Sequence, residues 1–160
     1  MINTLVAEPE PPVAAGPFRA QLRFLISAGS VSAGVIAELA DLRHDQLRPL
    51  LGRGGPGDDV IPAAVARRLI TVTAAEVRAV RYELVPAEPV RQGLERLLAG
   101  DWDLDRLTRY LRIRRPALRL LLDGQTLACS RLTQLRVLAA LRTLPRRAVS
   151  AATRSLRPVA

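Results

Sequence analysis

The chain of 160 residues is long enough for one domain or two very small ones, and 49% hydrophobic residues are enough for a core. Only 3% of the residues are aromatic, and no stretch alternates apolar and polar residues over a strand's length, which favours an all-α fold. The net charge of +9, from 24 arginines against 15 acidic residues, indicates a polyanionic partner: nucleic acid or an anionic membrane surface.

The chain carries few of the residue types that catalysis and metal binding use. Cys129 is the one cysteine and His44 the one histidine, which excludes an internal disulfide and a zinc site. The sequence also lacks a phosphate loop, a nucleophile elbow and a cluster of metal ligands, so we expect no enzyme, cofactor or metal. No segment approaches the ~20 apolar residues of a membrane span. Because the N-terminus also lacks a signal-peptide pattern, we expect a cytoplasmic protein that contacts no membrane.

In chain order, the sequence predicts two units of short helices between two less ordered ends. Prolines and glutamates indicate that residues 1–17 are a flexible leader. Each unit, 18–72 and 89–144, is expected to contain four short helices, with a partly helical linker at 73–88. Residues 145–160 carry four arginines and no acid, which indicates a basic tail.

Punctuating residues mark the ends of the expected helices. Gly29 and Gly100 are expected to end the first helix of each unit. The last helix of each unit is expected to begin with Pro62 at its first position and with Ser130 as its N-cap. The segment TAAE at 73–76 has the form of a capping box, so the linker helix is expected to run from there to about Tyr82.

The two units share an apolar frame, which becomes visible when the chain is shifted by 71 residues. This shift lays residues 28–54 on residues 99–125. The matching pairs are Gly29 and Gly100, Ile36 and Leu107, Ala40 and Leu111, Leu42 and Ile113, Leu47 and Leu118, and Leu50 and Leu121. One ancestral unit used twice is the simplest explanation, and chance agreement between two amphipathic helix pairs is the alternative.

All the excess positive charge lies in the second half of the chain. Residues 1–80 hold 8 arginines and 8 acidic residues, whereas residues 81–160 hold 16 arginines and 7 acidic residues. Six of these arginines lie in DLDRLTRYLRIRRPALRLLLDG (103–124), around leucines at helical spacing. This pattern predicts two short helices joined by a tight turn.

The frame of Ile36, Ala37, Ala40, Leu42, Leu47 and Leu50 resembles the helix-turn-helix of the Cro/repressor type. With ARRLITV and PVRQGLERLLAGDW beyond it, the region from 18 to 141 is similar to tandem helix-turn-helix proteins of actinobacteria and their phages. The resemblance implies two tandem helix-turn-helix units. It also implies a sequence-specific transcriptional regulator, repressor-like, that binds double-stranded DNA.

Four positions depart from the pattern of this family. Its turn usually holds glycine in a left-handed conformation, and here Asp41 and Arg112 take that place. Thr108 replaces the small alanine in the second copy. Pro49 falls inside the second helix of the first pair, where proline costs ~3 kcal/mol or kinks the helix. That helix is therefore expected to be short, shifted or degenerate, whereas Pro116 lies near a helix start, where proline is accepted.

The resemblance also implies which side chains would contact DNA, because the second helix of the motif lies in the major groove. In the second unit, Arg114, Arg115 and Arg119 are expected at base edges, where arginine pairs with guanine, and Arg106, Arg109 and Arg112 near phosphates. The first unit offers His44, Gln46 and Arg48, offset by Asp41 and Asp45. Alternatively, the arginines are only the solvated face of an amphipathic helix.

Two further questions stay open at the level of sequence. The first unit either contacts DNA or packs against the second unit, binds a partner protein or mediates dimerisation, so we expect a monomer with two units or a weak homodimer. The main alternative function is a protein-interaction adaptor, built on degenerate helix-turn-helix units, that binds RNA polymerase or a host regulator.

Overall fold

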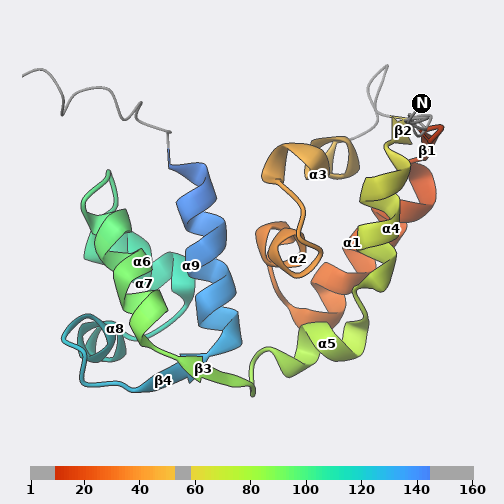
Figure 1. The fold of residues 1–160 in the computed structure, drawn as a ribbon. Helices are drawn as coiled ribbons and strands as arrows, with labels where there is room; N and C mark the ends of the chain where they lie inside the picture. The colour runs from red at the N-terminus through yellow and green to blue at the C-terminus, as the bar shows by residue number, and fades with distance from the viewer. Residues whose placement is uncertain (1–9, 53–58, 145–160) are drawn as a thin grey trace, which may run out of the picture.

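The computed structural model describes residues 10–52 and 59–144, and these residues form a largely helical fold (Figure 1). The prediction of a largely helical protein is confirmed. In chain order the elements are β1 (Val13–Ala14), α1 (Gly16–Gly29), α2 (Ala33–Leu39), α3 (His44–Leu51), β2 (Val60–Ile61), α4 (Ala63–Thr71), α5 (Ala74–Ala79), β3 (Leu84–Pro86), α6 (Glu88–Leu98), α7 (Leu104–Leu111), α8 (Arg115–Leu122), β4 (Ala128–Ser130) and α9 (Arg131–Thr143).

The order of elements repeats along the chain. A short strand, three helices, a second short strand and a fourth helix occur first from β1 to α4 and again from β3 to α9, with α5 between them. β1 pairs antiparallel with β2, and β3 pairs antiparallel with β4. The sequence did not predict these strands, because two or three residues are too few to show an alternating pattern.

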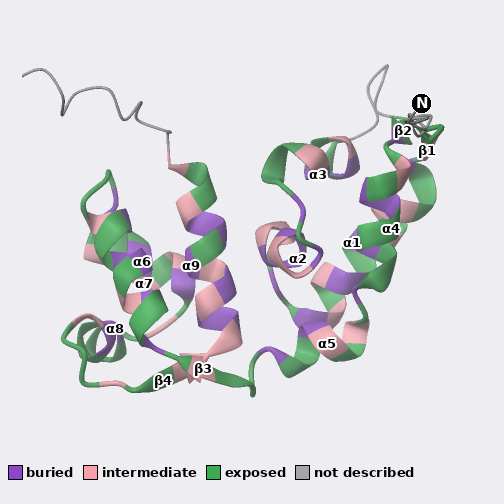
Figure 2. Ribbon diagram, viewed as in Figure 1, coloured by how far each residue is buried: buried purple, intermediate pink, exposed green. Residues whose placement is uncertain are grey.

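The apolar frame of the repeat forms the interior of both halves, as its helical spacing predicts. Figure 2 shows buried residues along the inner sides of the helices. Of the matched pairs, the buried residues are Gly29, Ile36, Ala40, Leu42, Leu47 and Leu50 in the first half and Leu107, Leu111, Leu118 and Leu121 in the second. Ile113 is half-buried.

Both ends of the chain lie partly outside the described residues. The expected basic tail at 145–160 and the first nine residues of the expected leader cannot be compared with the structure. The rest of the leader is not a flexible segment. Residues 13–14 form β1, which pairs with residues 60–61, and α1 already begins at Gly16, two residues before the expected start of the first unit.

The first helix of each unit ends at the expected glycine or just before it, but neither glycine adopts the left-handed conformation of a helix cap. The left-handed residue after α1 is Ser30, with φ 47°, whereas Gly29 is the last residue of the helix and packs against Val77 of α5. A β-carbon built on Gly100 would lie 3.1 Å from Cδ2 of Leu144, and α6 ends before it, at Leu98. Both glycines therefore allow close packing.

The starts of three other helices lie close to the expected positions. The hydroxyl of Thr73 accepts a hydrogen bond from the backbone N–H of Glu76 at 3.2 Å, and α5 then ends at Ala79, before the expected Tyr82. Ser130 caps α9 by accepting from the N–H of Thr133 at 3.3 Å. Pro62 is the N-cap of α4, one residue before the expected position.

Helix α9 belongs to both halves of the molecule and lies between them (Figure 1). Leu132 and Leu135, in its first turns, complete the core of the first half. Val137 and Ala140, further along, lie in the core of the second half. This shared helix holds the two halves together as one packed body.

Two close contacts fix α9 in place. A β-carbon built on Gly93 of α6 would lie 2.6 Å from Cγ1 of Val137, so glycine lets these helices approach. On the other side, Nε of Arg142 lies 2.6 Å from Oε1 of Glu38 in α2. The side chain of Glu38 is only 6% exposed and that of Arg142 is 39% exposed, so this ion pair is a partly buried contact between the halves.

Candidate nucleic-acid interface

Each half contains two short helices joined by a turn, α2 with α3 and α7 with α8. In both turns a residue other than glycine adopts the left-handed conformation: φ is 49° at Asp41 and 53° at Arg112. These are the two positions at which the resemblance to the helix-turn-helix pattern predicted that conformation. It costs an ordinary residue roughly 1–2 kcal/mol, so both turns are kept despite a local penalty.

Pro49 does not break α3. The helix runs from His44 to Leu51 and has eight residues, as many as α8. The carbonyl oxygen of Pro49 accepts a hydrogen bond from Nε of Arg19 at 3.1 Å, and Leu47 and Leu50 are buried on either side of the proline. The contacts of α3 with the core thus hold the proline in the helix, and the expectation of a short or shifted helix is wrong.

The N-terminal ends of α7 and α8 are held next to each other. The carboxylate of Asp103 caps α7 by accepting from the backbone N–H of Arg106 at 2.6 Å. In the first turn of α7, Oδ1 of Asp105 lies 3.3 Å from Nη1 of Arg115, the first residue of α8. The two helix starts therefore form one continuous polar surface.

Three exposed arginines lie on α8, two at its start and one in its last turn. Arg114 is its N-cap, and Arg115 and Arg119 are four residues apart, which places them on one side of the helix. Leu118 and Leu121 point into the core, so the arginine side faces outward, at the edge of the molecule (Figure 2). Among the described residues, Asp105 is the one acidic partner recorded for these arginines.

The arginines of α7 are exposed but have partners within the protein. The guanidinium of Arg106 lies over the ring of Trp102, 4.1 Å from its centre. Trp102 is buried and meets Tyr110 edge-on, at 5.2 Å between ring centres, so it covers the start of the helix pair. Nε of Arg109 donates to the carbonyl oxygen of Asp105 at 3.3 Å.

The corresponding surface of the first half has little net charge. His44 and Arg48 are exposed on α3 beside Asp45. A hydrogen bond from Arg43 lowers the pKa of Asp45, which keeps its carboxylate ionised. The side-chain oxygen of Gln46 accepts from the backbone N–H of Arg43 at 2.8 Å, so this amide caps α3. The three first-half candidates thus share a helix, but they do not form a basic cluster.

The two candidate helices do not lie side by side. In Figure 1, α3 lies in the upper part of one half and α8 at the lower outer edge of the other, with α9 between the halves. A ligand that touches both helices must therefore extend across α9.

Arg112 is separate from the other arginines of the second half. It lines a cavity with Arg81, from the segment after α5, and Arg136, from α9. Arg81 and Arg136 were not identified as site residues from the sequence. The frame shift of 71 residues applies to the helix pair, whereas Arg136 corresponds to Arg68 under a shift of 68, because the chain between the third helix and the following strand is shorter in the second half.

Other kinds of site find no support in the part of the chain that the structure describes. It contains no group of three or more histidine, cysteine or carboxylate side chains that could hold a metal ion. Within it, no single helix is long and apolar enough to cross a membrane; only α1 and α2 taken together, bent by 103°, reach that length and composition. Comparisons with protein-family models, curated proteins and solved structures found no match.

Proposed function

We propose that the protein is a sequence-specific regulator of transcription that binds double-stranded DNA through two tandem helix-turn-helix units. The observation that carries this proposal is the exposed group of arginines on α8: Arg114 and Arg115 at its start and Arg119 in its last turn. In a helix-turn-helix, the N-terminal residues of the second helix meet base edges in the major groove, while the first helix crosses the backbone. The α7–α8 pair has the order of elements, the left-handed turn and the charge that this mode of binding needs.

In this mode α8 enters the major groove. Its three arginines donate to base edges, and each can pair with O6 and N7 of guanine, which favours a site containing G·C pairs. The ion pair between Arg115 and Asp105 is exposed, with 52% and 69% of the side chains accessible, so it is weak and gives way to a base. Arg106 and Arg109 lie on the neighbouring helix, where phosphates are within reach.

The first unit contributes less to binding. His44, Gln46 and Arg48 lie beside an ionised carboxylate, which repels phosphate. Because α3 and α8 differ in side chains and lie apart, a monomer would read an asymmetric site. A protein-interaction adaptor that binds RNA polymerase or a host regulator is the alternative, and the experiment below separates the two.

The test is a mobility-shift assay with genomic fragments and competitor DNA, repeated over a series of salt concentrations. If about five arginines each neutralise one phosphate, log K should fall with log salt at a slope of about −4 to −5. Arg114, Arg115 and Arg119 changed together to alanine should abolish specific binding, since each good base contact contributes about 1–3 kcal/mol.

The control variant carries the same loss of charge on the first half: Arg23, Arg67 and Arg78 changed to alanine, all of them exposed. It should keep specific binding, and a variant with His44 and Arg48 changed to alanine should lose only part of it. A flat salt response, or equal losses in the α8 variant and its control, would contradict DNA recognition by α8 and support the adaptor. Circular dichroism of each variant establishes that it is folded.

A further inference from the structure

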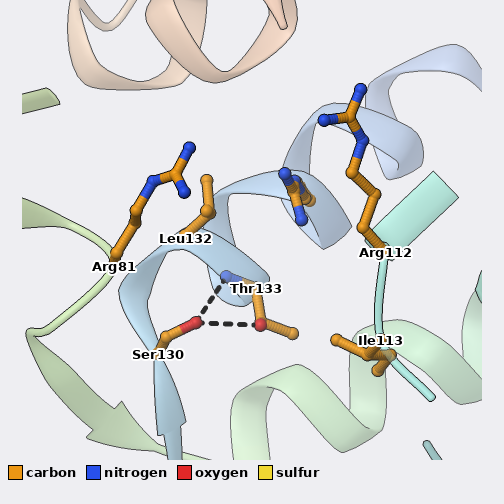
Figure 3. Close-up of a pocket in the computed structure, with 7 residues that line it drawn as sticks. Arg81, Arg112, Ile113, Ser130, Leu132 and Thr133 are labelled. Atoms are coloured by element: carbon orange, nitrogen blue, oxygen red, sulfur yellow. Dashed lines mark hydrogen bonds between the residues drawn. The ribbon is translucent and has the colours of Figure 1, made fainter. Parts of the chain in front are cut away.

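A cavity of about 320 Å³ lies beside the turn between α7 and α8. Its wall combines three segments far apart in the sequence: the residues after α5, this turn, and the start of α9. Figure 3 shows the side chains of Arg81 and Arg112 on opposite sides, with Ser130 and Thr133 between them. Arg136 completes the lining.

Positive charge dominates this cavity. Burial, and then the neighbouring charges of Arg112 and Arg81, lower the pKa of Arg136 from its ordinary value. Arg136 donates to the carbonyl oxygen of Leu111, and Arg81 to that of Gly29, so both guanidinium groups are held by backbone oxygens rather than carboxylates. Among the described residues, no hydrogen bond or ion pair is recorded for the side chain of Arg112.

The nearby carboxylates are engaged elsewhere. Glu83 accepts two hydrogen bonds from Nη1 of Arg131, each of 3.0 Å. Glu38, on the α2 side of α9, is paired with Arg142. The three guanidinium charges of the cavity therefore have no internal counter-ion in the part of the chain that the structure describes.

In the first half, a carboxylate of the protein is the counter-ion of the corresponding arginine. Arg68 of α4 has the place of Arg136. It donates to the carbonyl oxygen of Asp41, in the turn after α2, and Arg136 donates to that of Leu111, the last residue before the turn after α7. Arg68 also lies 3.2 Å from Oδ2 of Asp41, the left-handed residue of that turn. In the second half the same turn position holds Arg112, so a cation replaces the carboxylate.

Hydroxyl groups add to the anion-binding character of the site. Oγ of Ser130 lies 3.0 Å from Oγ1 of Thr133, and both side chains face the cavity. The backbone N–H groups of Arg131, Leu132 and Thr133, at the start of α9, already donate to oxygens of Glu83, Val80 and Ser130, so the side chains are the donors that the cavity offers. Guanidinium and hydroxyl groups are donors that hold phosphate in proteins.

We propose that this cavity binds a phosphate group, with Arg81, Arg112 and Arg136 as its counter-charges and the hydroxyls of Ser130 and Thr133 as further donors. The phosphate belongs either to the backbone of bound DNA or to a small phosphorylated molecule, because both present the same oxygens. The site stands on its own residues and does not depend on base recognition by α8.

The first arm of the test is calorimetric titration of the full chain with inorganic phosphate at constant ionic strength. Saturable binding is expected, and Arg112→Asp, which restores the charge arrangement of the first half, should weaken it about tenfold or more, the loss of at least one charged hydrogen bond. The matched control is Arg96→Asp, an exposed position on α6 with the same change of charge, which should leave phosphate binding unchanged. Should the charge reversal prevent folding, Arg112→Gln takes its place.

The second arm measures duplex DNA binding by the same variants over a salt series. If the cavity holds a DNA phosphate, Arg112→Asp should reduce the salt slope by about 1 more than Arg96→Asp does, and free phosphate should compete with DNA. If it holds a small molecule, the two variants should have equal slopes while Arg112→Asp alone loses phosphate. Equal phosphate binding by the wild type and Arg112→Asp, together with equal salt slopes for the two variants, would overturn the proposal.

Discussion

Gly93 lies where α6 meets α9. Whether its replacement by alanine raises or lowers the free energy of unfolding should depend on Val137. A β-carbon built on Gly93 would lie 2.6 Å from Cγ1 of Val137 and 3.3 Å from Cδ1 of Leu141, closer than side chains pack without a shift. Overpacking costs about 1–3 kcal/mol, whereas alanine is about 1 kcal/mol better than glycine inside a helix, so Gly93→Ala should lower the free energy of unfolding by about 1 kcal/mol.

The same substitution should stabilise a protein that already carries Val137→Ala. Val137 is 2% exposed, and its truncation alone should cost about 2 kcal/mol. Without Cγ1, the nearest atom to the new methyl group of residue 93 is Cδ1 of Leu141 at 3.3 Å, the end of a flexible side chain that can shift by a few tenths of an ångström. The helix preference of about 1 kcal/mol then dominates. The two single changes should therefore be coupled by about 2 kcal/mol.

Urea unfolding of the four proteins, followed by circular dichroism and by the fluorescence of Trp102, measures this cycle. Trp102 lies in the same core as Val137, so its emission reports the region that is changed. The control is Gly16→Ala, at the first position of α1, where an added β-carbon meets nothing within 4 Å. Equal stabilisation by Gly93→Ala in both backgrounds would refute the close approach of α6 and α9.

Two further predictions concern α2 and the end of α1. Burial raises the pKa of Glu38, although the neighbouring Arg142 opposes this shift. The folded protein then holds the Glu38 proton more tightly than the unfolded chain does, so stability should fall as pH rises from the ordinary glutamate pKa through the raised one. Glu38→Gln should remove this fall in the urea midpoint measured against pH, and parallel curves for the two proteins would contradict it. Ser30 has φ 47°, whereas Ser32 has φ −83°. Ser30→Gly should therefore raise the free energy of unfolding by about 1 kcal/mol, and Ser32→Gly should lower it in the same urea assay. A higher free energy of unfolding for both variants would contradict this prediction.

The sequence predicted the structure best where a local pattern of residue types determines the local conformation. Leucines at helical spacing predicted the helices and their buried sides, because burial follows the period of the helix. The resemblance to the helix-turn-helix pattern also implied that Asp41 and Arg112 are the left-handed turn residues, although neither is glycine. Local pattern and local geometry agree at these positions, so no tertiary information was needed.

The remaining features depend on contacts between distant segments. The strands pair residues 13–14 with 60–61 and 84–86 with 128–130, and each is too short to show a pattern. Pro49 predicted a disrupted helix, but packing of the adjacent leucines outweighs its local preference. The arginine cavity joins residues 81, 112 and 136, whose proximity exists only after α9 has packed between the halves.

The position of α9 has a consequence for how the chain is made. Domains usually fold from the N-terminus onward while the ribosome is still synthesising the rest. Here the side of α2 that carries Gly34 and Glu38 stays in water until residues 131–143 have left the ribosome, because Ala139 and Arg142 of α9 cover it. The first half therefore cannot finish folding ahead of the second, and both acquire their native packing in one late step after translation has passed α9.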